Sequence, residues 1–126
     1  MNEDPILRIA RLLLKRTRTG DVQWVPTDDE QAFLCSTKDS SVVVRTVLDS
    51  DGDENVVLSL LNARGQEVGE LRSTWDQEES DEAWPRYRPG ANNKLLQDLA
   101  EGARRNALQV DQVVEGLLKE LGGDQS

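Results

Sequence analysis

The side chains that most often perform catalysis are nearly absent from this chain. Its 126 residues include no histidine and one cysteine, Cys35. Histidine and cysteine supply most general bases, activated nucleophiles and transition-metal ligands near neutral pH. Cys35 lies in a predicted strand beside Leu34 and has no histidine to activate it, so we expect a buried structural thiol. Histidine-based catalysis is excluded, and we predict that the chain is not an enzyme.

Carboxylates are the remaining candidates for chemistry, because the chain has 24 acidic residues. The run DSDGDE at 49–54 imitates the start of a calcium-binding loop, in which alternate carboxylates converge on one cation. Counting from Asp49, however, the sixth position is Glu54 instead of glycine, and the twelfth is Leu60 instead of a closing carboxylate. We therefore interpret the run as a hairpin tip with a turn at Asp51-Gly52, and we predict neither a metal nor another cofactor.

The segment 75–90 is the first candidate binding surface. An acidic run interrupts the apolar pattern there, and the segment holds two of the three tryptophans and the only tyrosine. Tryptophan, tyrosine and arginine are enriched among residues that dominate the energies of protein interfaces. We predict a loop whose partner-binding residues are Trp75, Trp84, Arg86, Tyr87 and Arg88. The alternative is that both tryptophans fold back onto the sheet while the acidic residues face water.

A basic stripe near the beginning of the chain is the second candidate surface. It consists of Arg8, Arg11, Lys15 and Arg18, at steps of three, four and three residues. This spacing places the four side chains on one polar side of a helix, opposite an apolar side. Such a helix can bind an anionic membrane or a groove in a partner. Most pack their apolar side against their own domain, which is what we predict here.

An α+β domain must position these surfaces, and we expect one domain over residues 1–126. Asp4 and Pro5 begin a helix over 4–19 that Gly20 ends. Apolar residues then alternate with a period of two, between short turns, over 22–74. This pattern predicts a five-stranded antiparallel meander with edge strands near Val22 and Val68. Apolar residues return to helical spacing over 92–121, as one bent helix or two, and we expect the helices to pack on one face of the sheet.

Short motifs along the chain carry a resemblance to known proteins. They comprise Leu14, Thr17, Gly20, Trp24, Thr27, Phe33, Asn62, Gly65, the segment ARRNALQVD at 103–111 and the segment LLKEL at 117–121. In these residues the chain resembles a family of small bacterial proteins without an assigned function. The resemblance implies a bacterial, cytoplasmic protein with a helix, sheet, helix order, and it supplies no catalytic residues. The chain departs from the family pattern at Ala100, where an aromatic residue is expected, and in the acidic segment 75–90.

Composition and charge narrow the class of function. The net charge of -9 argues against general nucleic-acid binding, which requires lysine and arginine to neutralise phosphates. No apolar stretch approaches the roughly 18 to 20 residues of a transmembrane helix, and a lone cysteine forms no internal disulfide, so we expect a cytoplasmic protein.

We predict a non-enzymatic protein–protein interaction module, such as a small bacterial adaptor, a chaperone-like accessory or an immunity-type protein. One alternative is a divalent-metal-dependent enzyme subunit that uses carboxylates. Another is a nucleic-acid accessory protein that uses the basic first helix. A homo-oligomer is also compatible with the sequence.

Overall fold

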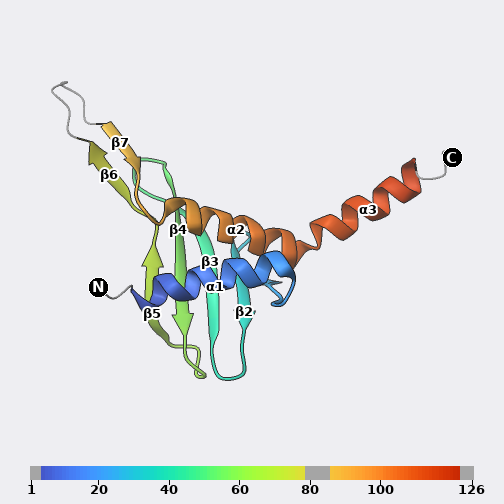
Figure 1. The fold of residues 1–126 in the computed structure, drawn as a ribbon, viewed down its shortest axis with the longest axis horizontal. Coiled ribbons are helices and arrows are strands. Elements are labelled where there is room, and N and C mark those ends of the chain that lie inside the picture. Colours follow the sequence, from blue (N-terminus) through green and yellow to red (C-terminus); the bar gives the residue numbers. More distant parts are fainter. Residues whose placement is uncertain (1–3, 79–85, 123–126) are drawn as a thin grey trace.

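The computed structural model describes residues 4–78 and 86–122 and shows an α+β fold. Its helices are α1 (Pro5–Thr19), α2 (Asn93–Leu108) and α3 (Val110–Leu121). Its strands are β1 (Val25–Pro26), β2 (Ala32–Ser36), β3 (Ser41–Leu48), β4 (Glu54–Leu61), β5 (Glu67–Arg72), β6 (Trp75–Glu78) and β7 (Arg86–Pro89). The predicted fold class is confirmed, and Figure 1 shows the arrangement of the elements.

The first helix begins and ends at the predicted signals. The Asp4 carboxylate accepts a hydrogen bond of 2.9 Å from the backbone N–H of Ile6, and Pro5 occupies the first turn. Gly20 ends α1 in the left-handed conformation (φ 79°), where its N–H donates to carbonyls of the last turn. Glycine adopts this conformation without the steric cost of a Cβ atom.

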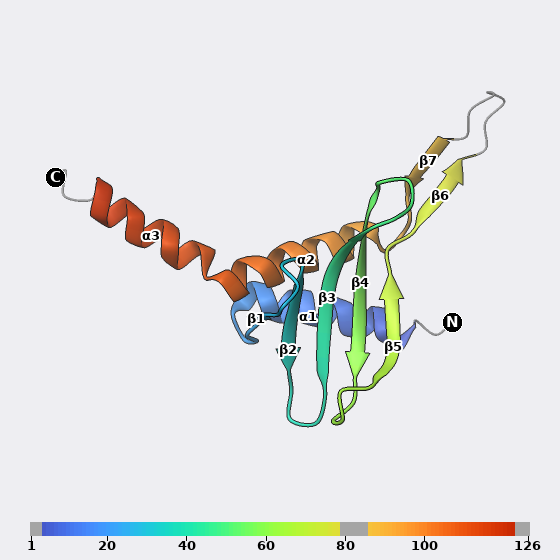
Figure 2. The ribbon, with the colours of Figure 1, turned by 180° about the vertical axis from the view of Figure 1, so that it is seen from behind.

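Strands β1 to β5 form a meander in which every neighbouring pair is antiparallel, in the order β1-β2-β3-β4-β5. Phe33 pairs with Val44, and Val44 pairs with Leu58, so apolar residues of three strands face the same side. The short turns produce this order because hairpin links permit only antiparallel neighbours. The predicted five-stranded sheet, with β1 and β5 at its edges, is confirmed (Figure 2).

The first strand is shorter than predicted, because residues 22–24 bond a helix instead of a strand. The backbone N–H of Trp24 donates to Asn106 Oδ1 at 2.7 Å, and Asn106 Nδ2 donates to the Val22 carbonyl at 3.3 Å. This exchange satisfies the extended backbone at Val22 and Trp24 with an α2 side chain. Strand β1 therefore begins at Val25.

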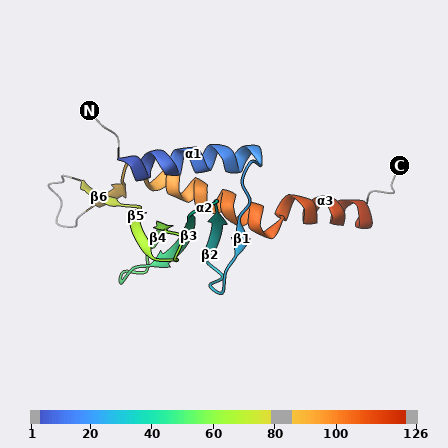
Figure 3. The ribbon, with the colours of Figure 1, turned by 90° about the horizontal axis from the view of Figure 1, so that it is seen from below.

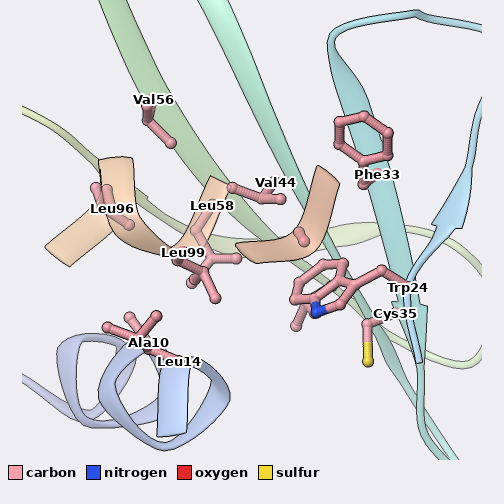
Figure 4. Close-up of a cluster of buried hydrophobic side chains, with 12 residues drawn as sticks. Ala10, Leu14, Trp24, Phe33, Cys35, Val44, Val56, Leu58, Leu96 and Leu99 are labelled. Atoms are coloured by element: carbon pink, nitrogen blue, oxygen red, sulfur yellow. The ribbon is translucent and has the colours of Figure 1, made fainter. Parts of the chain in front are cut away.

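Helices α1 and α2 cover one face of the sheet (Figure 3). Helix α2 packs on β1 to β4, while α1 lies beside α2 and contacts β5. Both helices and the strands contribute side chains to one core (Figure 4). Its members are Ala10, Leu14, Trp24, Phe33, Cys35, Val42, Val44, Val56, Leu58, Leu96, Leu99 and Ala103. The prediction that the first helix packs its apolar side on its own domain is thus confirmed.

The prediction of a loop over 75–90 is wrong for the described part of that segment. Strands β6 and β7 pair antiparallel, with Trp75 opposite Pro89 and Glu78 opposite Arg86. The sequence did not predict this hairpin, because its residues are mostly polar and show no apolar alternation. Hydrogen bonds between the two backbones form the hairpin, and they do not require such a pattern. Residues 79–85, which include Trp84, lie outside the described residues.

The C-terminal segment is two helices. Gln109 separates them in the left-handed conformation (φ 55°), with its N–H directed to the carbonyls of Arg105 and Asn106. Left-handed backbone at one residue ends α2 and turns the chain before α3 begins. Helix α2 packs on the sheet as predicted, whereas α3 extends from the end of α2 beyond the edge of the sheet (Figures 1 and 3).

Candidate functional site

Helix α3 presents an unpacked apolar surface, which we call the α3 stripe. It consists of Val110, Val113, Val114, Leu117, Leu118 and Leu121. No residue of α3 is buried, and the exposed fraction rises from 48% at Leu117 to 81% at Leu121. At 3.6 residues per turn these six residues share one side of the helix, opposite Gln112, Glu115 and Lys119. A contiguous exposed apolar surface of this kind makes α3 a candidate docking surface.

The junction with α2 holds α3 away from the body. Besides the backbone bonds of Gln109, the Arg105 guanidinium donates to the Asp111 carboxylate across the break. The principal contacts of α3 are with α2. Because the stripe lies beyond the edge of the sheet, the domain leaves it open to a partner.

Sequence reasoning missed the α3 stripe as a site. The spacing of its valines and leucines predicted a helix, and the same spacing is typical of a helix packed in a core. The number of apolar helices was one signal in the sequence that could have indicated this site. A five-stranded sheet of this length is covered on one face by α1 and α2, which leaves a third apolar helix without a place.

The basic stripe is exposed along α1, as predicted. Arg11, Lys15 and Arg18 line a shallow groove of about 420 Å³, together with Leu14 of α1 and Leu95 of α2. Arg18 forms an ion pair of 3.5 Å with Asp98, and exposed pairs of this kind contribute little stability. The groove joins a positive rim to an apolar side, and Arg8 extends that rim by one helical turn.

The structure describes only part of the predicted tryptophan surface. The Trp75 side chain is 40% exposed, and its indole N–H donates to Asn55 Oδ1 at 3.2 Å. Backbone pairing places Arg86, Tyr87 and Arg88 together on β7. Trp84 lies outside the described residues, so the gathering of all five side chains stays a prediction.

The acidic run at 49–54 forms the tip of the β3–β4 hairpin, as predicted, with Leu48 opposite Glu54. Carboxylate oxygens of Asp49, Asp51 and Asp53 lie within 4.8 Å of one another. Asp49 Oδ1 accepts from the backbone N–H groups of Asp51 and Asp53, both at 2.9 Å, and Oδ2 accepts from Asn55 at 3.1 Å. These bonds give the Asp49 carboxylate a structural role in closing the loop.

Hydrogen bonding also shifts the titration of Asp49. The backbone N–H of Asp53 makes the largest contribution and holds the pKa of Asp49 below its usual value. Bonds from Asn55, Asp51 and Gly52 act in the same direction, and they outweigh partial burial, which raises the pKa. The folded loop therefore favours the ionised carboxylate.

Cys35 is buried at 2% exposure, and burial raises the pKa of its thiol. Raising the pKa lowers the thiolate fraction at neutral pH, and only the thiolate is a strong nucleophile. The prediction of a buried thiol is confirmed.

A second groove, of about 370 Å³, opens beside α2 above the ends of the central strands. Phe33, Val44 and Val56 form its apolar side, and Glu101 and Arg104 of α2 stand at its rim. Two described carboxylates line the groove, those of Glu54 and Glu101, and both are exposed to solvent.

The sheet face opposite the helices is partly apolar. Leu34, Val43 and Val47 are half-buried there, with the Arg45 side chain on the same face. A charged side chain among these apolar groups gives the face a mixed character, in contrast to the continuous α3 stripe.

None of the described helices is both long and apolar enough to span a lipid bilayer. Three residues of the sequence resemblance bond between elements: Trp24, just before β1, donates to Thr17 of α1 and to Asn106 of α2. Comparison of the chain with protein-family models, with curated proteins and with solved structures gave no match.

Proposed function

We propose that this protein works by contact, as a non-enzymatic protein-binding module, and that α3 is its principal docking element. One observation carries the proposal: α3 has six large apolar residues, and none of its residues is buried. Exposed apolar surface is unfavourable in water, and burying it against a partner recovers about 25 cal/mol per Å². The α3 stripe therefore supplies a driving force for association.

The chemistry of the described residues supports the same proposal. The thiol of Cys35 is buried, and the Asp49 carboxylate is engaged by its own loop. The basic groove on α1 and the β6–β7 hairpin are further contact surfaces in this proposal. A cytoplasmic location is part of it, supported by a single cysteine that is free and buried.

The test uses the full chain as bait in a lysate of the organism that encodes it. The test variant carries Leu117→Glu and Leu121→Glu, which place charge on the α3 stripe. Its matched control carries Gln112→Glu and Lys119→Gln, which change the charge by the same amount on the opposite side of α3. We expect the wild-type and control baits to capture the same protein, and the stripe variant to lose it.

Identical capture by all three baits would contradict the proposal, because the α3 stripe would then contribute nothing to binding. Thermal unfolding of each bait supplies the necessary check on folding. Substitution of exposed residues changes stability by about 0.5 kcal/mol or less, so the stripe variant should remain folded.

A further inference from the structure

Helix α3 needs a partner to be stable as a helix. Isolated helices shorter than about 12 to 15 residues are marginal in water, and α3 has 12. Gly116 in its middle costs a further ~1 kcal/mol relative to alanine. Gln109 at its N-cap position makes no side-chain capping bond. Packing of the α3 stripe must therefore provide the missing stability.

We propose that a second copy of this chain packs against the α3 stripe, so that two α3 helices pair antiparallel about a two-fold axis. This inference rests on the proposed function and names its partner. In such an isologous contact each residue of one copy meets the residue at the mirrored position of the other. The centre of α3 lies between Val114 and Leu117, so Val114 meets Leu117 and Val110 meets Leu121.

The sizes of the side chains fit this orientation. The half of the stripe nearest α2 is made of valines, and the outer half is made of leucines. Antiparallel pairing sets valines against leucines along the whole contact, which keeps the distance between the helices even. Parallel pairing would instead set leucine against leucine at one end and valine against valine at the other. Interdigitation of large with small side chains is the arrangement that fills an apolar contact.

Charge also permits and directs self-association at α3. The whole chain carries -9, which opposes dimerisation, but the segment 93–121 has four basic and five acidic residues and nets -1. The repulsive charge therefore lies away from the contact. Antiparallel pairing opposes the two helix dipoles, and it keeps Glu120 of one copy away from Glu120 of the other. Parallel pairing would bring Glu120 against its own copy.

The area of the contact between the two α3 helices predicts the strength of the dimer. At 1.5 Å per residue α3 is about 18 Å long, and Leu108 at the end of α2 is 43% exposed and extends the contact. A contact of this length falls below the roughly 800 Å² per partner of a standard interface. Interfaces of that small class are weak, so we expect dissociation in the micromolar range.

Sedimentation velocity of the full chain, from about 1 to 500 μM, tests the proposal. The wild-type chain should shift from monomer to dimer across this range. The Leu117→Glu/Leu121→Glu variant should raise the dissociation constant by roughly a hundredfold or more, since each dimer loses four leucines of the contact. The Gln112→Glu/Lys119→Gln control should dimerise like the wild type. A wild-type chain that stays monomeric at 500 μM, or equal dimerisation of all three proteins, overturns the proposal.

Cysteine cross-linking tests the orientation, because Cys35 is buried and contributes little background. Val110→Cys and Leu121→Cys chains are oxidised separately and as an equimolar mixture. Antiparallel pairing predicts a mixed disulfide between positions 110 and 121 that exceeds the 121–121 product by at least about tenfold. A dominant 121–121 disulfide overturns the antiparallel arrangement.

Failure of this inference is distinguishable from failure of the proposed function. A monomeric wild-type chain that still captures a different protein through the α3 stripe retains the docking function and loses only the second copy. Equal capture by all baits contradicts the docking function itself.

Discussion

At the scale of residues, buried polar groups join the elements of this domain. The Trp24 indole N–H donates to Thr17 Oγ1 at 2.9 Å, and that hydroxyl donates to the Leu13 carbonyl at 2.6 Å. Trp24 is 1% exposed, so its N–H has no access to water. Thr17 thereby fixes the long side chain of Trp24 between α1 and the sheet.

Removing the hydroxyl of Thr17 should lower the free energy of unfolding. Thr17→Val keeps the shape but leaves the indole N–H unpaired, and an unsatisfied buried donor costs about 1 to 3 kcal/mol. Chemical denaturation should show this loss in the free energy of unfolding. Thr17→Ser keeps the hydroxyl and should lose less. Equal stability of the valine variant and the wild type would mean that the bond contributes nothing.

Asp49 gives the β3–β4 hairpin a dependence on pH. Because its pKa is lower in the folded loop, the stabilisation is complete above the unfolded pKa, about 4, and is lost as pH falls through the folded value. Asp49→Asn should flatten the fall in melting temperature below pH 4. Ser50→Ala, in the same loop, should keep the wild-type profile. An unchanged profile for Asp49→Asn would show that the carboxylate does not stabilise the fold.

At the scale of elements, Gln109 decides where α3 goes. It is the one non-glycine residue with positive φ in the described part of the chain. Glycine occupies this conformation freely, whereas a β-branched residue is strained there. The direction of α3 is therefore encoded in a single backbone position.

Substitutions at Gln109 should act on stability in opposite directions. Gln109→Gly should stabilise the chain by about 0.5 kcal/mol, and Gln109→Val should destabilise it by about 1 to 2 kcal/mol. Thermal unfolding at a fixed protein concentration measures both. If Gln109→Val is as stable as the wild type, the left-handed junction is not maintained in solution.

The predictability of each element followed from its chemistry. Strands such as β3 and β4 were predicted because their apolar residues alternate between two turns. Strands β6 and β7 were missed, since acidic and basic side chains conceal a pairing made by the backbone. Helix α3 was predicted as a helix, but an apolar stripe has the same spacing whether it faces a core or a partner.

At the scale of the whole molecule, two elements project from a closed body. The core joins α1, α2 and the sheet, while α3 extends at one end and the β6–β7 hairpin at the other (Figures 1 and 2). The size and the net charge of the chain did not indicate this shape, because both are properties of the whole molecule and do not say where its elements lie. The candidate site is accordingly evident in the exposure of α3 and not in the composition of the chain.

The body should fold without help from the α3 stripe. Leu99→Ala, in the core, should lower the free energy of unfolding by about 2 to 5 kcal/mol. Leu117→Ala should change it by about 0.5 kcal/mol at protein concentrations below dimer formation. Denaturation of dilute protein compares the two. A large loss for Leu117→Ala would mean that α3 is packed within one chain.

The most direct measurement of the central claim is photo-cross-linking in living cells, with the cross-linking amino acid at Leu117 on the α3 stripe or at Lys119 on its opposite side. Both positions are exposed on the same helix, so they differ mainly in the face that they sample. The proposed docking role predicts a discrete protein adduct, either a second copy or another protein, from position 117 and none from position 119. No adduct at position 117, or equal adducts at both positions, would contradict a docking role for α3.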